Sequence, residues 1–254
     1  MPEMSVLPVA GMPLFAPGMS VAAELASALA KAGVTLRDDD LIVVAQKIVS
    51  KAEGRLVSLN EMTAGGDAQK LASETGREPE MAQLILDESS DILRANKAAI
   101  IARHKTGHVL ANAGIDASNV ADGKVLLWPV DPDASARTIR AELHRLTGAC
   151  PAIVIADSMG RAWRIGTVGG AIGCAGLTVL DDRRGTGQDL FGRTLQATVI
   201  AVADAASGAA VLAMGEGAEG TPAALVRGCG QWIASADGPG ATSGLRPAAE
   251  DMFR

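Results

Sequence analysis

The chain has 254 residues, of which 48% are hydrophobic, so it is long enough to bury one large core or two closely packed lobes. Its formal net charge of -6 leaves no excess of cations to neutralise a nucleic-acid backbone. Aromatic residues make up only 2% of the chain, so base-stacking surfaces are hard to build. We therefore expect a globular, enzyme-sized protein that has no nucleic-acid partner.

The cysteines and the N-terminal segment bear on the cellular compartment. Cys150, Cys174 and Cys229 are odd in number and outside any CxxC spacing, which predicts free thiols rather than disulfides or a zinc site. The N-terminal segment carries several prolines and no cationic leader, unlike a secretory signal peptide. No apolar run approaches the roughly 18 residues of a membrane span. We expect a cytoplasmic protein with no membrane partner.

The first half of the chain predicts short strands and two amphipathic helices. One helix begins after Ser20, a typical capping residue, and ends before Gly33. The apolar run at residues 41–45 is typical of a buried strand, and an abruptly polar segment follows it. A second helix is predicted over residues 78–94, because its apolar residues fall on one face. Further strands are predicted at residues 6–10, 98–102, 108–114 and 124–128.

The second half predicts a helix over residues 134–147, capped by Asp133 and stopped by Gly148. Strands and helices are mixed without strict alternation, which predicts an α+β fold with mixed, largely antiparallel sheets. The sequence has no internal repeat, linker or clear boundary, so residues 1–254 are predicted to form one unit whose two lobes are interwoven. A buried strand is predicted at residues 151–156 and a largely helical segment at residues 189–213, and a last apolar run covers residues 223–228.

Four polar clusters interrupt this apolar chain, each beside a predicted strand or helix end. The first lies within residues 48–55 and contains Lys51. A lysine there could hold a phosphate group as a point charge. The alternative is a lysine in an ordinary surface turn.

The second cluster, at residues 112–120, contains Asp116, Asn119 and other polar residues around a glycine. Carboxylate and amide oxygens suit a hard cation such as Mg²⁺ or Mn²⁺. The alternative is a turn stabilised by Asp and Asn side chains that hydrogen-bond their own backbone. The residues alone leave both interpretations open.

The third cluster follows the predicted strand at residues 151–156. Asp157 and Ser158 stand at the expected strand end, where sites are commonly built, and Arg161 and Arg164 follow. A carboxylate and a hydroxyl can bind a metal, and guanidinium groups can clamp phosphate or carboxylate oxygens. The alternative is a helix capped by Asp157 with surface arginines beyond it.

The fourth cluster spans residues 180–193 and is followed by the glycine-rich segment at residues 214–220. Glycines let backbone amides approach an anion closely, although Glu216 and Glu219 would then need a metal between them and the anion. The alternative is a glycine-rich helix terminus. The chain contains neither GxxxxGK[ST] nor GxGxxG, so neither a P-loop nor a Rossmann domain is predicted.

Taken in order and at consistent spacing, several strings resemble the coenzyme F420-0:L-glutamate ligase family. The resemblance covers almost the whole chain. It implies a GTP-dependent enzyme that uses Mg²⁺ or Mn²⁺, assisted by K⁺, and adds L-glutamate to the lactyl carboxylate of F420-0 to give gamma-glutamyl F420. It also implies an intertwined homodimer, without the nitroreductase-like C-terminal domain of some bacterial members. The strings are PVAGMPLF (8–15), VAQKIVSKAEGR (44–55), NAGIDASNV (112–120), ADSMGRAWRIG (156–166) and MGEG (214–217).

The resemblance also implies roles for individual residues. Asp116, Asp157 and Ser158 would be metal ligands for two ions, and Glu216 a further ligand close to the nucleotide. Lys51 would neutralise phosphate charge. From the residues themselves we expect Arg161 or Arg164 to orient the acidic substrate, although Ile165 stands where many members have a second arginine. The implied nucleotide contacts are Met12, Pro13, Leu14, Phe15, Gln46, Lys47, Lys51, Asn119, Met214, Gly215, Glu216, Gly217, Ala218 and Glu219.

These carboxylates, the lysine and the arginines suit an enzyme that forms an amide bond. A carboxylate must be activated, and phosphoryl transfer from a nucleotide gives an acyl phosphate that an amine can attack. The charge that develops on the transferred phosphoryl group is stabilised by metal ions and fixed cations. Two other interpretations stay open. A metal-dependent phosphohydrolase could use the same carboxylates to activate water, and a nucleotide- or deazaflavin-binding module would perform no chemistry.

Overall fold

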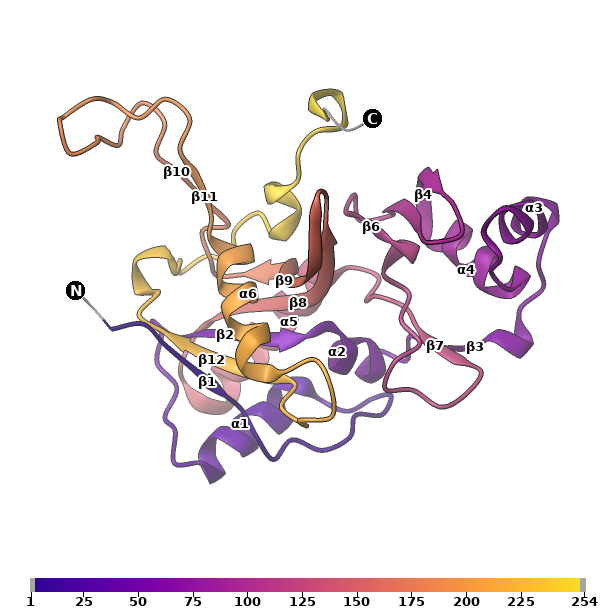
Figure 1. The fold of residues 1–254 in the computed structure, drawn as a ribbon. Coiled ribbons are helices and arrows are strands. Elements are labelled where there is room, and N and C mark those ends of the chain that lie inside the picture. The colour runs from indigo at the N-terminus through magenta and orange to yellow at the C-terminus, as the bar shows by residue number, and fades with distance from the viewer. Residues whose placement is uncertain (1–2, 252–254) are drawn as a thin grey trace.

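The computed structural model describes residues 3–251, with a five-stranded sheet at its centre (Figure 1). Its strand order is β1-β12-β2-β8-β9, and neighbouring strands are antiparallel except for β2 and β8, which are parallel. Strands far apart in sequence therefore lie side by side. The strands are β1 (Ser5–Pro8), β12 (Ala223–Arg227), β2 (Leu41–Ala45), β8 (Ala152–Arg161) and β9 (Arg164–Ala175).

Helices cover both faces of this sheet. Successive side chains of a strand point to opposite faces, so a strand of consecutive apolar residues must be covered on both sides. Ile42 and Val44 of β2 belong to a core with α1, α2 and α5, whereas Leu41 and Val43 belong to a core with α6. The continuous apolar run of β2 is thus buried on both sides. The helices are α1 (Val21–Lys31), α2 (Gln46–Ala52), α5 (Pro132–Thr147) and α6 (Val202–Met214).

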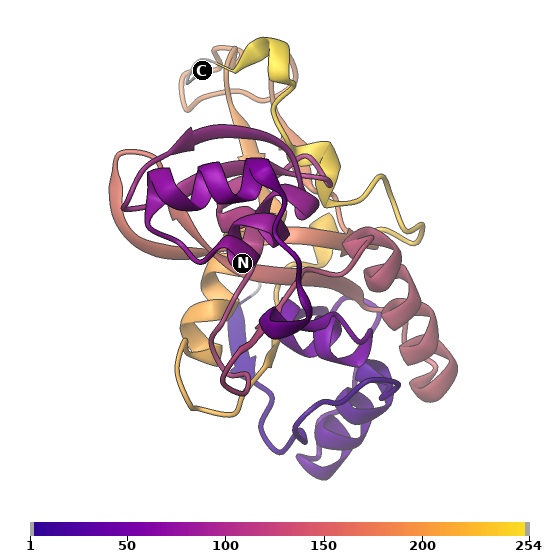
Figure 2. The same cartoon turned by 90° about the vertical axis from the view of Figure 1, so that its right-hand side faces the viewer.

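A smaller body with its own hydrophobic core lies to one side of the central sheet and faces the viewer in Figure 2. Two helices, α3 and α4, pack on an antiparallel sheet of order β4-β5-β6, and the antiparallel pair β3-β7 joins this body to the rest. Its helices are α3 (Gly66–Thr75), α4 (Pro79–Glu88) and the short turns η1 (Leu59–Glu61) and η2 (Asn112–Gly114). Its strands are β3 (Leu56–Ser58), β4 (Ser89–Ala95), β5 (Ile100–His104), β6 (Val109–Ala111) and β7 (Lys124–Leu126).

A long arm projects from the central body between β10 and β11, which are antiparallel (Figure 1). At its tip Asp189 Oδ1 accepts hydrogen bonds from the backbone N–H groups of Phe191 (2.8 Å) and Arg193 (2.9 Å). Leu190 and Phe191 are exposed there. The remaining elements are β10 (Leu180–Asp182), β11 (Val199–Ala201) and the C-terminal turns η3 (Gly230–Trp232), η4 (Ala241–Gly244) and η5 (Ala248–Glu250).

The α+β fold is confirmed, but two long predicted helices are shorter than expected. The helix predicted over residues 78–94 ends at Glu88, and residues 89–95 form β4, because pairing with β5 outweighs the helical spacing of the apolar residues. The helix predicted over residues 189–213 begins only at Val202. Its predicted first half is arm, where Gly192 adopts a φ of 76° that a helix does not allow.

Smaller corrections concern three segments. The polar segment after β2 is the helix α2 rather than a surface turn. Strand β8 continues to Arg161, so Asp157 lies inside a strand instead of at a strand end or at a helix cap. Asp131, not Asp133, caps α5: its Oδ1 accepts a hydrogen bond from Ala134 N at 2.8 Å. The strand predicted at residues 108–114 pairs only as far as Ala111.

The three cysteines are free, as predicted, and burial raises the pKa of the Cys174 thiol to about 12, which keeps it protonated and unreactive. Within residues 3–251, none of the helices has the length and apolar character needed to cross a membrane.

Arg140 on α5 holds the C-terminal segment against the sheet. Its buried guanidinium donates to the carbonyl oxygens of Pro151 (3.0 Å) and Ala234 (2.7 Å) and to Asp237 Oδ1 (2.7 Å). Removing the donor leaves these acceptors unpaired. We expect Arg140→Met to lower the free energy of unfolding by about 3 kcal/mol, measured by urea denaturation.

A matched control lies one turn away on the same helix. The ion pair of Arg137 with Asp131 is 3.8 Å long and exposed, so Arg137→Met should change the free energy of unfolding by less than about 0.5 kcal/mol. Equal losses in the two variants would show that the buried hydrogen bonds of Arg140 do not hold the tail.

Candidate active site

A pocket of about 400 Å³ opens where β2 ends and α2 begins. Ala45 of β2 pairs with Ala156 of β8 in the parallel part of the sheet, so the residues that follow both strands emerge at one edge. The carboxyl ends of parallel strands are a common place for ligand sites. The pocket is lined by residues from 12–15, 45–51, 156–158 and 211–222, together with Asn119.

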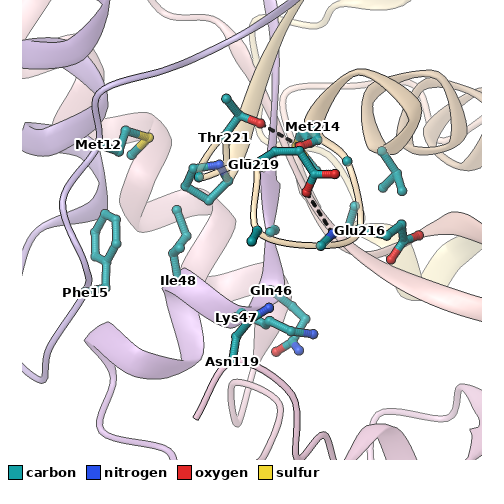
Figure 3. A pocket seen from close by; sticks show the side chains of 18 of the residues that line it. Met12, Phe15, Gln46, Lys47, Ile48, Asn119, Met214, Glu216, Glu219 and Thr221 are labelled. Carbon is teal, nitrogen blue, oxygen red and sulfur yellow. Dashed lines mark hydrogen bonds between the residues drawn. The ribbon is translucent and has the colours of Figure 1, made fainter.

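Every residue for which the family resemblance implied a nucleotide contact lines this pocket, as do Asp157 and Ser158. Figure 3 shows Met12 and Phe15 on one side and the loop with Glu216 and Glu219 on another. The fold thus brings together segments more than 200 residues apart in sequence. That these residues bind a nucleotide stays a prediction. Sequence reasoning missed the other lining residues, Ala45, Ile48, Ala156, Val211, Gly220, Thr221 and Pro222.

The glycine-rich loop after α6 closes one side of the pocket through its own hydrogen bonds. Thr221 Oγ1 donates to Met214 O (2.6 Å), and Gly217 N donates to Glu219 Oε2 (2.8 Å), as the dashed lines in Figure 3 show. Gly215 ends α6 with a φ of 80°, and a Cβ there would lie 2.3 Å from Glu219 Cδ. The segment is therefore a helix terminus and a pocket wall at once, and only glycine fits at position 215.

Asp157 presents a carboxylate to the pocket in a fixed orientation. Its Oδ2 accepts a hydrogen bond from Trp128 Nε1 (2.8 Å), and its Oδ1 accepts one from Ser158 N (2.9 Å). Burial raises the pKa of Asp157 to about 6, although the hydrogen bond from Trp128 acts to lower it. Beside it, Ser158 Oγ donates to Glu216 Oε2 at 2.6 Å. Three of the predicted metal ligands thus lie together on one wall.

Asp116, the fourth predicted ligand, is not among the residues that line the pocket, but it pairs with Lys47, which is. Burial acts to raise the pKa of Asp116, but the hydrogen bonds from Lys47 and from Ser118 N outweigh it and leave the pKa below its usual range. Ser118 N donates to Asp116 Oδ1 at 2.6 Å, so the aspartate also forms the local turn that sequence reasoning offered as the alternative.

Lys51 differs from Lys47 in its partner. Its Nζ donates to the backbone carbonyl of Asn119 at 2.8 Å, and no ion pair of Lys51 occurs within residues 3–251. Burial and the nearby charge of Lys47 lower the pKa of Lys51. An ammonium group without a carboxylate partner on the wall of a pocket is suited to bind an anion.

The donor set is chemically suited to Mg²⁺ or Mn²⁺, because the candidate ligands offer carboxylate and hydroxyl oxygens. Among residues 3–251, His, Cys, Asp and Glu side chains nowhere converge in a group of three that could hold a metal ion. Mg²⁺ is commonly bound by one or two carboxylates together with substrate phosphates and water. The arrangement around Asp157 and Glu216 fits a metal that binds together with a nucleotide rather than in an all-protein cage.

The structure does not bring Arg161 and Arg164 to the pocket. Both are exposed at the turn between β8 and β9, and Arg161 Nη2 donates weakly to Ile165 O at 3.3 Å. Trp163 between them is 89% exposed with a φ of 62°. A role for these arginines in orienting an acidic substrate stays a prediction.

Comparison with known proteins defines the class and then the family. The sequence model described as F420-0:Gamma-glutamyl ligase matches residues 11–228, a range that includes every predicted site residue. The protein is an enzyme of the ligase class. More narrowly, the chain belongs to the F420-0:gamma-glutamyl ligase family.

Its similarity to individual relatives extends over most of both chains. It is 44% identical to a coenzyme F420:L-glutamate ligase of Methanothermobacter thermautotrophicus over 98% of this chain and 98% of the relative. It is 42% identical to the enzyme of the same name from Methanopyrus kandleri, over 86% and 87%. The corresponding protein of Haloarcula marismortui is 42% identical over 88% and 87%.

Proposed function

We propose that this protein uses GTP and a divalent metal ion, Mg²⁺ or Mn²⁺, to join L-glutamate to the lactyl carboxylate of F420-0. The observation that carries the proposal is the single pocket in which Lys51, Asp157, Ser158 and Glu216 meet the segments implied to contact nucleotide. The names of the relatives support the acceptor and the amino acid. GTP, the metal ions and an accompanying K⁺ are proposed from the family resemblance.

Each group on the pocket wall has a part in this chemistry. Asp157, with Ser158 and Glu216 beside it, would hold the metal against the nucleotide phosphates, with Asp116 at the edge for a second ion. A bound Mg²⁺ or Mn²⁺ polarises the phosphoryl oxygens. Lys51 would add a fixed positive charge where negative charge develops during transfer.

The reaction balances in two steps. A carboxylate oxygen of F420-0 attacks the γ-phosphorus of GTP, the bond to the bridging oxygen breaks, and GDP leaves. The amine of glutamate then attacks the acyl carbon, inorganic phosphate leaves, and the amine loses a proton to give the amide. Positioning and electrostatic stabilisation of the phosphoryl group supply the catalysis, which matches a pocket rich in fixed charges.

We further propose that the protein works as a homodimer. The arm between β10 and β11 carries Leu190 and Phe191 at its tip, with exposures of 101% and 84%. Large apolar side chains on a projecting arm are costly to leave in water and favour burial against another chain. Sedimentation equilibrium of the protein and of a Phe191→Ser variant would test this, with a dimer expected for the first and a weakened dimer for the second.

The test of the proposed function is the mass of the product. Incubation with F420-0, L-glutamate, GTP and Mn²⁺ should yield F420-0 extended by glutamate, with one GDP formed for each amide bond. GTP turnover that needs neither glutamate nor F420-0 would instead identify a phosphohydrolase. Tight GTP binding in calorimetry without any product would identify a binding module.

Binding of Mn²⁺ in the absence of nucleotide should depend on pH. A metal must displace the proton that Asp157 holds below its pKa of about 6, whereas Asp116, with its lowered pKa, is already ionised there. Lowering the pH from about 7.5 to about 5 should therefore weaken Mn²⁺ binding about tenfold. Electron paramagnetic resonance of free Mn²⁺ measures this. A constant affinity across the range would show that Asp157 does not bind the ion.

A further inference from the structure

Trp128 links the smaller body to the pocket. It lies two residues after the end of β7, is fully buried, and donates its indole N–H to Asp157 Oδ2 at 2.8 Å. Trp128 does not itself line the pocket, whereas Asp157 does. The indole therefore reaches the pocket through the Asp157 carboxylate to which it donates.

The indole is held by contacts from several sides. The ring centroids of His104 and His108 lie 4.9 Å and 5.5 Å from that of Trp128, one tilted and one edge-on. Arg55 Nε donates to Trp128 O at 2.8 Å, which fixes the backbone. Gly114 packs so closely that a Cβ there would lie 2.5 Å from the indole nitrogen. The ring has no room to turn, so the N–H direction is fixed.

The type of donor matters for the charge of Asp157. Asp116 is paired with the ammonium group of Lys47, which neutralises it, but an indole N–H is uncharged. Trp128 therefore orients the Asp157 carboxylate without neutralising it. Carboxylates that bind metals are commonly held by such outer partners, and loss of the partner weakens metal binding.

We propose that Trp128 is a positioning residue that holds the Asp157 carboxylate in the orientation in which it binds a divalent metal ion. The inference rests on the proposed function, since it requires Asp157 to be a metal ligand. A residue that served only to fill the core would affect stability and leave metal affinity unchanged.

The experiment compares Mn²⁺ binding in the full chain with GDP present, followed by electron paramagnetic resonance of free Mn²⁺. Trp128→Phe removes the N–H donor and should raise the Kd for Mn²⁺ by about tenfold or more. The control is Leu143→Val, a change in a fully buried residue of the same core that the structure places on α5. It should lower Tm while leaving the Kd for Mn²⁺ within about twofold of the unmodified protein.

A second variant removes the donor without changing the shape of the ring. Incorporation of 3-benzothienylalanine at position 128 replaces the indole N–H by sulfur, so it preserves the packing against His104 and His108 and keeps the test valid if Trp128→Phe fails to fold. The same rise in Kd is expected. An unchanged Kd in this variant overturns the inference.

The two hypotheses can fail separately. If Asp157→Asn abolishes Mn²⁺ binding but the benzothienyl variant binds normally, the role of Trp128 is wrong and the metal site stands. If Asp157→Asn leaves Mn²⁺ binding unchanged, Asp157 is not a ligand, and both the metal assignment and the role of Trp128 are overturned.

Discussion

Replacing Asp157 by asparagine should reduce the rate of glutamate ligation by about 10³-fold, because a metal ion that stabilises the transferred phosphoryl group contributes several kcal/mol. Asparagine has nearly the same shape, and its single amide oxygen can accept one of the two hydrogen bonds that the carboxylate accepts, from Trp128 Nε1 or from Ser158 N. The substitution thus removes the negative charge and leaves the packing intact. Rates of product formation by mass spectrometry at increasing Mn²⁺ concentrations measure the effect.

The stability of this variant should move in the opposite direction to its activity. The folded-state pKa of Asp157, about 6, lies above the ordinary value of 3.8, so the free energy of unfolding falls as the pH rises from about 3.8, and the cost of the buried charge is complete above about pH 6. Above that pH, asparagine relieves the cost of a buried charge, and Tm should hold or rise. A variant that is inactive yet at least as stable would separate a catalytic role from a structural one.

Asp204 on α6 accepts a hydrogen bond from Ala171 N at 2.9 Å and does not line the pocket, so Asp204→Asn should retain ligation. If Asp157→Asn turned over normally at saturating Mn²⁺, Asp157 could not be a ligand of a required metal.

Local sequence signals predicted correctly those elements whose structure is determined by neighbouring residues. Ser20 caps α1, with its Oγ accepting from Ala23 N at 3.0 Å, and the uninterrupted apolar residues 41–45 form β2. The sequence strings that resemble the ligase family likewise gave the lining of the pocket, because each string contributes a short contiguous segment to it.

The pairing of neighbouring strands could not be predicted in the same way. Residues 89–95 have apolar spacing that suits a helix, and only β5, a partner that follows them in the chain, makes them a strand. The paired strand β9 was missed because its glycine-rich segment lacks a local strand signal; at Gly173 a Cβ would lie 2.3 Å from Pro132 O.

The contact between Trp128 and Asp157 shows the same limit within the site. The two residues are 29 positions apart, and the segment around Trp128 contains no pattern that marks a partner for a carboxylate. Sequence reasoning placed Asp157 at a strand end, whereas the structure places it inside β8, held by the ring of Trp128 from the segment between β7 and α5. The sequence predicted that Asp157 could bind a metal ion, but it did not predict the hydrogen bond from Trp128 that orients the carboxylate.

Replacing Lys51 by methionine should lower kcat/KM for GTP by about 10²-fold, the order expected when one fixed group that stabilises developing charge is removed. Lys51 bonds only to the carbonyl of Asn119 in the contacts described for residues 3–251, so its charge remains available to phosphate oxygens. Lys47 is already paired with Asp116 and therefore provides less net positive charge to the pocket. Steady-state rates at varied GTP concentrations measure the effect.

Two comparisons separate the charge of Lys51 from its shape. Lys51→Arg keeps the positive charge but spreads it over a planar fork, so it should recover part of the lost rate. Lys47→Met should act differently, because it leaves the half-buried Asp116 carboxylate without its cation and should raise the pKa of that group. If Lys51→Met left kcat/KM for GTP unchanged while Lys47→Met lowered it, the phosphate-binding lysine would be Lys47, and its pairing with Asp116 would have to break when the nucleotide binds.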